Sequence, residues 1–263
     1  MNNHDISYKL YGDDMQFVEV ELDPGETVIA EAGSLMMMED RIEMETIFGD
    51  GSKDQGILGK LVQAGKRVLT GESLFMTAFT NTGQGKKHVS FASPYPGKII
   101  PMDLSELDGK IICQKDSFLA AAKGVSVGIE FQRKIGTGFF GGEGFIMQKL
   151  EGDGMAFVHA GGTIHSRTLE AGETLRIDTG CLVAMTGDVD YHIEFVRGIK
   201  TALFGGEGLF FATLHGPGTV WVQSLPFSRL ASRVFAAMPE KGGSKGEGSV
   251  AGGLFDLLGG DRR

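Results

Sequence analysis

The residues best suited to chemistry are three glutamates, each of which follows a glycine in the same kind of turn. They are Glu72, Glu143 and Glu207. If the three turns converge, carboxylates with raised pKa values could bind a ligand or act in acid–base catalysis. The alternative is that each glutamate caps backbone N–H groups at the start of the next strand. We favour the capping role, because repeated turns reuse residues for folding before they do so for function.

Basic and aromatic side chains lie near these glutamates and could form a surface for a ligand or a partner. An arginine lies shortly upstream of each glutamate, where it could form an ion pair with the turn. Together with neighbouring phenylalanines, these arginines could also engage anionic lipid headgroups, to which each base contributes about 1 kcal/mol. The simpler alternative is that the phenylalanines pack under the end of the fold. The candidate surface comprises Glu72, Glu143, Glu207, Arg67, Arg133, Arg197, Phe139, Phe140 and Phe204.

Other motifs match catalytic, cofactor or metal signatures without the context that those signatures need. Residues 124–128 match G-x-S-x-G, but Ser126 lies in an alternating strand pattern and not in a strand-to-helix turn. Residues 136–141 match G-x-G-x-x-G, but no strand–helix–strand unit surrounds them. His159 and His165 do not have the spacing of a typical metal-binding pair. We therefore expect no catalytic residue, no bound metal and no cofactor.

The glutamate turns belong to an internal repeat. The segment Phe139–Gly154 (FFGGEGFIMQKLEGDG) recurs downstream as Leu203–Gly218 (LFGGEGLFFATLHGPG), and no insertion or deletion is needed on either side. A third, more diverged copy precedes them, in which Ser34 corresponds to Ser117 and Cys181. This first copy is longer than the others, and its additional residues fall at turns. The chain therefore divides into three repeats, over about residues 19–101, 102–165 and 166–227.

Within each repeat, apolar and polar residues alternate with the period of β-strands, as in Phe17–Leu22 and Val125–Phe131. Glycine-rich turns interrupt these segments at the spacing typical of an all-β sandwich or barrel. We therefore predict an all-β fold. Because a single β unit of this kind cannot bury a face alone, we expect the three units to pack about a pseudo-threefold axis.

Two segments have the spacing of short amphipathic helices inserted into this β pattern. They are Ile57–Leu69 and the residues between Ser228 and Ala237, where Arg229 and Arg233 face away from the apolar side.

We expect residues 1–239 to form a single β domain that ends in the second of these helices. Residues 240–263 form a glycine-rich segment typical of a flexible tail. Its apolar stretch Leu254–Leu258 could dock on its own chain or on a partner.

The composition favours a protein of the cytoplasm. The 263 residues carry a net charge of −9, which argues against a large nucleic-acid interface. The N-terminus lacks the apolar segment of a secretory signal, and no stretch of about 18 apolar residues could cross a bilayer. The two cysteines, Cys113 and Cys181, are far apart and suit a reducing compartment.

The motifs FFGGEGF and LFGGEGL, together with LxPGE and GxG turns, resemble the family named after the mitochondrial-biogenesis protein altered inheritance of mitochondria twenty-four. The resemblance extends from about Asp5 to Phe227. It implies a fold similar to the trp RNA-binding attenuation protein, with three repeats in a double-stranded β-helix-like sandwich. The eukaryotic relatives are associated with the organisation of the mitochondrial inner membrane. No catalytic residues follow from the resemblance, and the missing Arg-rich presequence fits a bacterial, cytoplasmic setting.

The sequence leads to one principal hypothesis on function and two alternatives. The principal hypothesis is a non-enzymatic scaffold that binds protein partners or itself, and that could lie at an anionic membrane surface. The first alternative is a module that binds small molecules or RNA, by analogy of fold alone. The weaker alternative is an enzyme that uses Glu72, Glu143 and Glu207.

Overall fold

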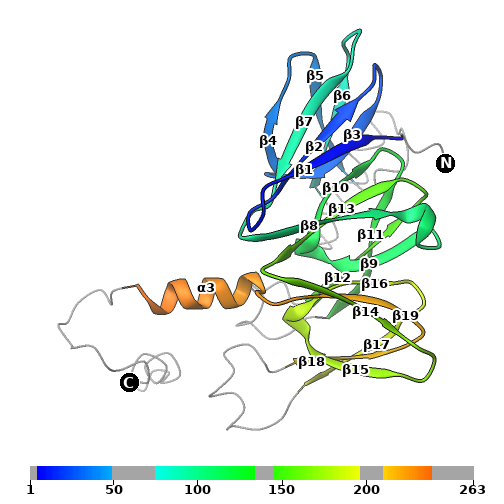
Figure 1. The fold of residues 1–263 in the computed structure, drawn as a ribbon, viewed down its shortest axis with the longest axis vertical. Coiled ribbons are helices and arrows are strands. Elements are labelled where there is room, and N and C mark those ends of the chain that lie inside the picture. Colours follow the sequence, from blue (N-terminus) through cyan, green and yellow to red (C-terminus); the bar gives the residue numbers. More distant parts are fainter. Residues whose placement is uncertain (1–4, 49–74, 134–144, 196–209, 239–263) are drawn as a thin grey trace, which may run out of the picture.

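The structure, a computed structural model, describes residues 5–48, 75–133, 145–195 and 210–238 (Figure 1). These residues form pairs of antiparallel strands, short 3-10 turns and one α-helix, α3 (Phe227–Ala236). The all-β, sandwich-like class is therefore confirmed. The expected helix over Ile57–Leu69 and the tail segment Leu254–Leu258 lie outside the described residues.

Most of the described strands fall into three sets of six, which follow one another along the chain. One further strand, β1 (Ser7–Tyr11), pairs with the first strand of the first set. The first set consists of β2 (Phe17–Leu22), β3 (Thr27–Glu31), β4 (Leu35–Met38), β5 (Ile42–Phe48), β6 (Phe75–Asn81) and β7 (Lys87–Ala92). The second set consists of β8 (Gly97–Asp103), β9 (Lys110–Gln114), β10 (Phe118–Ala122), β11 (Ser126–Arg133), β12 (Phe145–Glu151) and β13 (Met155–Gly161). The third set consists of β14 (Ile164–Leu169), β15 (Thr174–Asp178), β16 (Leu182–Thr186), β17 (Asp190–Phe195), β18 (Phe210–His215) and β19 (Gly218–Gln223).

The pairing inside each set is the same. The fifth strand lies between the second and the fourth, and the sixth strand lies between the first and the third. In the first set, for example, β6 separates β3 from β5, and β7 separates β2 from β4. The three sets are therefore copies of one small two-sheet unit, which confirms the internal repetition expected from the sequence.

An irregularity in one strand pair recurs in all three sets and supports this equivalence. The pairing of the third strand with the sixth shifts register after Leu35, after Phe118 and after Leu182. Each of these residues directly follows a residue of the aligned triplet Ser34, Ser117 and Cys181, so the three shifts occupy one position of the sequence repeat. Since a β-bulge is a specific local feature, its recurrence at matching positions shows that the repeats share their detailed geometry.

Neighbouring sets are joined by shared sheets. β10 of the second set pairs with β3 of the first, and β16 of the third set pairs with β9 of the second. The result is a linear stack, with the first set at the top of Figure 1 and the third at the bottom. This differs from the expected closure about a pseudo-threefold axis, because among the described strands no pair joins the third set to the first.

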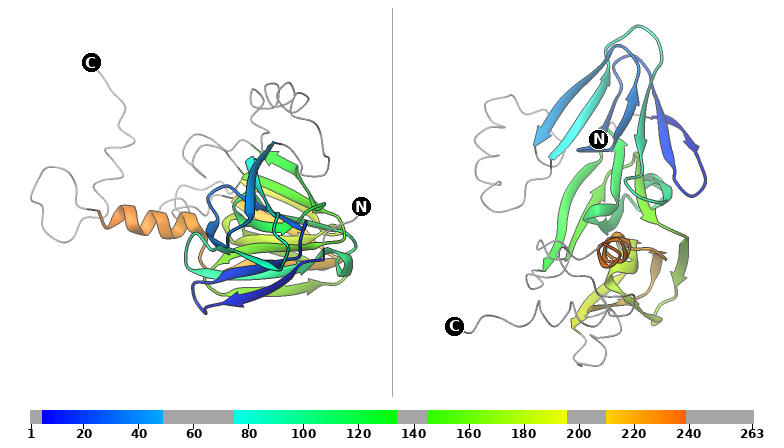
Figure 2. Two further views of the ribbon diagram at one scale, coloured as in Figure 1. Left: turned by 90° about the horizontal axis from the view of Figure 1, so that it is seen from above. Right: turned by 90° about the vertical axis from the view of Figure 1, so that its left-hand side faces the viewer.

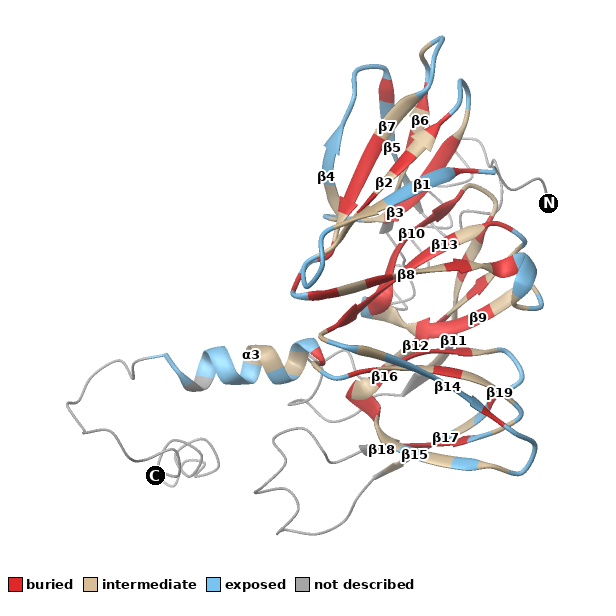
Figure 3. Ribbon diagram, in the orientation of Figure 1, coloured by how far each residue is buried: buried red, intermediate tan, exposed pale blue. Residues whose placement is uncertain are grey.

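The core is divided into apolar clusters that lie between successive sheets. All five residues of β10, Phe118–Ala122, are buried, because sheets of both neighbouring sets cover this strand. Such a continuous apolar run is what a strand covered on both faces requires. Figure 3 shows the buried segments of the middle set in red, in contrast to the exposed strand β4 of the first set.

Two glutamates that follow a glycine, Glu26 and Glu173, cap the turns in which they lie. Gly25 and Gly172 have positive φ angles of 86°, which glycine adopts without the strain that a Cβ would add. The next residue in each case is a glutamate, Glu26 or Glu173, whose carboxylate accepts a hydrogen bond from the backbone N–H three residues earlier, at 2.7 Å and 2.8 Å. Here a glutamate that recurs in a glycine turn has a structural role.

Candidate functional site

Most residues of the surface expected from the sequence occupy one equivalent connection of each set, between the fourth and the fifth strand. Arg133 is the last residue of β11, where its backbone pairs with Phe145 of β12. The remaining candidates lie outside the described residues; they are Glu72, Glu143, Glu207, Arg67, Arg197, Phe139, Phe140 and Phe204. The described structure therefore neither brings the predicted residues together nor separates them.

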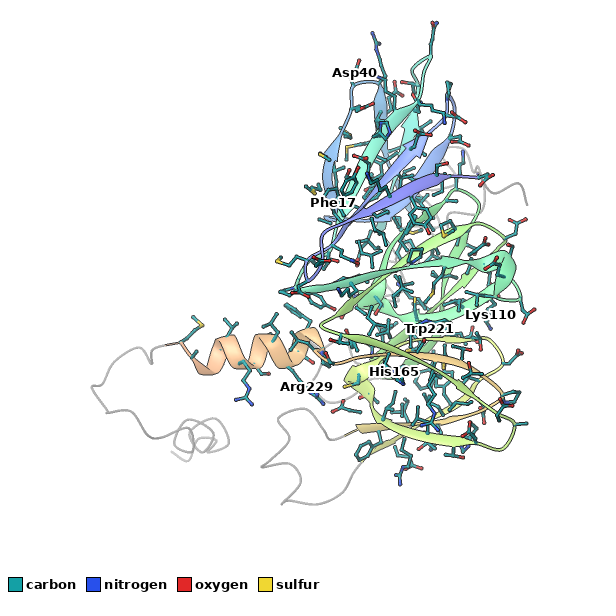
Figure 4. The ribbon with its side chains drawn as sticks, in the orientation of Figure 1. Phe17, Asp40, Lys110, His165, Trp221 and Arg229 are labelled. Atoms are coloured by element: carbon teal, nitrogen blue, oxygen red, sulfur yellow. The ribbon has the colours of Figure 1, made fainter. Side chains whose placement is uncertain are left out.

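The motifs that resemble catalytic signatures have structural positions where they are described. Ser126 is the first residue of β11 and pairs with Glu151 of β12, so it lies in a hairpin strand and not in a strand-to-helix turn. His159 is buried in β13, edge-on to the ring of Tyr95 at 4.3 Å. His165 is exposed on β14 (Figure 4). Among the described residues, no group of three or more histidine, cysteine or acidic side chains could hold a metal ion.

Among the described residues, the most perturbed carboxyl group is that of Glu31, at the end of β3. Burial, and next the nearby carboxylate of Asp116, raise the pKa of Glu31 to about 7. A glutamate of this kind could transfer protons near neutral pH. However, burial also raises the pKa of the neighbouring Cys113 thiol to about 12, so this cysteine is not an activated nucleophile.

The position of Glu31 in the repeat supports a structural role. Gln114 and Asp178 occupy the equivalent positions of the other two sets. The Gln114 amide donates to the carbonyl of Thr179 at 2.6 Å, and the Asp178 carboxylate accepts from the N–H of Gly180 at 2.9 Å. All three residues are the last of a strand that leads into a tight turn, and two of them satisfy backbone groups there.

In the part of the chain that the structure describes, two groups of exposed apolar side chains remain, and neither has a catalytic arrangement. The first, which we call the methionine edge, consists of Met36, Met37 and Met38 on β4, which are 50%, 46% and 43% exposed. The equivalent residues of β10 and β16 are all buried. The repeat pattern of the sequence carries one signal for this surface, because Met37 aligns with alanine, Ala120 and Ala184, in both other copies.

The second exposed surface is the apolar face of α3 together with Met238, which follows the end of the helix. Phe227, Val234, Phe235 and Met238 are 52%, 58%, 75% and 61% exposed. Their spacing places them on one side of a helix, while Arg229 lies on the other side. This agrees with the amphipathic helix expected between Ser228 and Ala237.

The base of α3 is fixed to the β body, whereas its remaining turns extend from it. The ring of Phe227 lies 5.1 Å from that of Tyr95, and the guanidinium of Arg229 pairs with the carboxylate of Asp178 at 2.8 Å (Figure 4). Figures 1 and 2 show that the helix then points away from the sheets. Beyond Phe227, the apolar side chains Val234, Phe235 and Met238 are largely exposed in the described part of the chain, which is typical of surfaces that bind partners or membranes.

The chain is similar to known proteins in both sequence and fold. A family model described as mitochondrial biogenesis AIM24 matches residues 8–225. An uncharacterized protein of Streptococcus pyogenes serotype M6 is 33% identical over 231 residues, which cover 86% of this chain and 88% of that protein. The X-ray crystal structure of a Streptococcus pyogenes protein has a similar fold, with a TM-score of 0.70 and 24% identity, and the match covers 89% of this chain and 100% of that chain. In the described part of the chain, no helix has the length and apolar character needed to span a bilayer.

Proposed function

Since this chain belongs to the mitochondrial biogenesis AIM24 family, we propose that it is a non-enzymatic scaffold protein that attaches to anionic membrane surfaces through α3. In this proposal the protein works in the cytoplasm, peripherally to the membrane. The observation that carries the proposal is the combination of an exposed apolar face and arginines on one projecting helix.

The charge of α3 favours an anionic surface. The helix Phe227–Ala236 contains two arginines and no acidic residue, although the whole chain has a net charge of −9. Arg229 is engaged by Asp178, while Arg233 lies one turn farther out, in the last turn of the helix. Arginine beside a face of phenylalanine and valine is the composition of helices that lie in the membrane interface.

The expected strength of attachment is modest. Full burial of a Val, Phe or Met side chain is worth roughly 1.5–3 kcal/mol. The four side chains of the apolar face are already partly covered, so together they should contribute about 4 kcal/mol, and one arginine adds about 1 kcal/mol at an anionic surface. A total of about 5 kcal/mol corresponds to a dissociation constant on the order of 0.1 mM in accessible lipid.

Vesicle flotation with the full chain tests the proposal. The protein should float with vesicles that contain phosphatidylcholine and phosphatidylserine, float less with phosphatidylcholine alone, and be released by salt. Val234→Asp should abolish flotation. The matched control Ser232→Asp adds the same charge to the polar side of the same helix and should retain most of the binding.

Three outcomes would contradict the proposal. Absence of flotation with anionic vesicles would rule out attachment to membranes and leave α3 as a surface for a protein partner. Equal binding to neutral and anionic vesicles would remove the role of the arginines. Equal losses for Val234→Asp and Ser232→Asp would show that charge alone acts, and not the apolar face.

A further inference from the structure

At each end of the described stack one strand has a free edge, and strands of these two types pair with each other twice inside the chain. Each internal junction pairs the second strand of one set with the third strand of the next, as β3 with β10 and β9 with β16. Two strands of these types are left over, β15 as a second strand and β4 as a third strand. Each is the edge strand of its sheet among the described residues.

We propose that copies of this chain associate head to tail, with β4 of one copy pairing antiparallel with β15 of another. The association would repeat the internal junction between two chains. It is independent of the proposed attachment of α3 to membranes.

The burial of β4 differs from that of its equivalents in the way this proposal requires. Met37 is 46% exposed and Met38 is 43% exposed, whereas the equivalent residues Ala120, Ala121 and their counterparts in β16 are 0% exposed. The internal strands owe this burial to the neighbouring set. A row of methionines on an open edge is the kind of surface that natural proteins otherwise protect with charges or cover.

The other half of the pair shows the same difference in burial. Leu175 and Ile177 of β15 are only half-buried. Their equivalents in β9, Ile111 and Cys113, are 0% exposed in a strand that is paired on both sides, with β12 and with β16. Both leftover strands thus carry apolar residues at positions where the internal junctions bury them.

The internal junctions also define the register of the proposed pair. Ala120 lies opposite Ala30 in one junction, and Ala184 lies opposite Cys113 in the other. In the aligned repeats, Met37 corresponds to Ala120 and Ala184, and Ile177 corresponds to Ala30 and Cys113. Met37 therefore lies opposite Ile177, and this apolar pair forms one end of the new junction. By the same correspondence Met38 lies opposite Arg176 at the centre, and Glu39 lies opposite Leu175 at the other end.

This junction must accommodate two charged residues, Glu39, which already contacts Lys87 and His88, and Arg176. The guanidinium of Arg176 already pairs with Glu194 at 2.7 Å and lies 5.7 Å from the ring of Phe211. A paired arginine can bury its stem along apolar side chains such as methionine. Alternatively, the charge of Arg176 prevents other strands from pairing with the edge of β15, and the chain then stays monomeric.

The symmetry of the assembly follows from the two different surfaces that it uses. A contact between unlike surfaces is heterologous and leads to a closed ring or an open filament, not to a twofold dimer. Direct β4–β4 pairing would instead form a twofold dimer, but no junction within the described chain joins two third strands. The two modes can be distinguished by cross-linking.

Single-cysteine variants provide the decisive experiment. In a Cys181→Ser background, where the remaining Cys113 is fully buried, Met37→Cys and Ile177→Cys are prepared separately and mixed under oxidation or with a short bismaleimide. Covalent dimers should form in the mixture and not in either variant alone. Dimers of Met37→Cys alone would show β4–β4 pairing, and absence of cross-links in the mixture would overturn the proposal.

Light scattering on unmodified and point-substituted protein gives an independent measurement. The full chain should have a mass above the 28.1 kDa of one chain, and Met37→Lys should reduce it to that value. Met44→Lys is the matched control, because Met44 is 50% exposed on β5, away from the proposed junction. A full chain that remains monomeric at high concentration would refute the proposal and support a protective role of Arg176.

Discussion

The raised pKa of Glu31 leads to a quantitative prediction about stability. Burial is its main cause, and the carboxylate of Asp116 adds to it, while Lys115 acts in the opposite direction. The phenol of Tyr95 and the thiol of Cys113 also face this group and are sensitive to its charge. Glu31→Gln keeps the shape of the side chain and removes its ionisation.

The sign of the effect follows from proton binding. In the unfolded chain Glu31 releases its proton near its ordinary pKa of 4.5, whereas the folded protein holds the proton until about pH 7. Between these values the folded state binds more protons, so the free energy of unfolding falls as the pH rises. The stabilising contribution of neutral Glu31 is complete below about pH 4.5 and is lost by about pH 7.

The magnitude follows from the size of the shift. A shift from 4.5 to about 7 corresponds to an upper value of about 3 kcal/mol, since each pKa unit is worth 1.36 kcal/mol. Because Glu31 is only half-buried, solvent screening reduces this to on the order of 1–3 kcal/mol. The Glu31→Gln variant should gain this amount relative to the unmodified protein as the pH rises from about 4.5 to about 7.

The assay is urea unfolding of both proteins at several pH values, followed by the fluorescence of Trp221, the single tryptophan of the chain. The difference between the two proteins is the informative quantity, because burial lowers the pKa of His159 to about 4 and gives the opposite dependence on pH. A difference that stays constant between pH 4.5 and 7, with equal slopes in urea, would refute the reasoning.

Four further substitutions test the fold and the attachment of α3 to the β body. Phe157→Ala, at a fully buried ring, should cost about 3–5 kcal/mol in urea unfolding, whereas Met15→Ala at a 62% exposed position should stay within about 0.5 kcal/mol. Gly97→Ala should be strongly destabilising in the same assay, because its Cβ would overlap the backbone oxygen of Ala160 in β13. Arg229→Ala removes the ion pair with Asp178, so hydrogen exchange should accelerate in α3 and remain unchanged in the sheets.

Much of the repeated architecture could be predicted from the sequence, because each unit is built from local patterns. The strand alternation, the recurrence of the GGEG motif and the glycine turns all depend on residues close in the chain. The amphipathic pattern of α3 is likewise local, and the structure confirms it.

The arrangement of the units could not be predicted in the same way. Whether three similar units close or stack depends on which strand edges pair over long distances, and the same apolar pattern is compatible with both. Met36, Met37 and Met38 illustrate this, because they have the composition of a core strand and are exposed only where no preceding set covers them. The glutamate turns are a different case, since Glu72, Glu143 and Glu207 lie outside the described residues and their role stays a prediction.

The two proposals reinforce each other physically without depending on each other. If copies join through β4 and β15, each copy contributes one α3 to the assembly. Several weak membrane contacts then act together, and the overall affinity can exceed that of a single helix by about 10²–10⁴. Met37→Lys should therefore weaken flotation without changing α3 itself.

The most direct test of membrane attachment is the environment of Phe235, the most exposed side chain of α3 at 75%. In Phe235→Trp, the tryptophan emission should shift to the blue when phosphatidylserine-containing vesicles are added, and brominated lipids should quench it. The unmodified protein, in which Trp221 reports alone, serves as the control and should not respond. An unchanged emission of the Phe235→Trp variant under conditions in which the protein floats with vesicles would contradict attachment through α3.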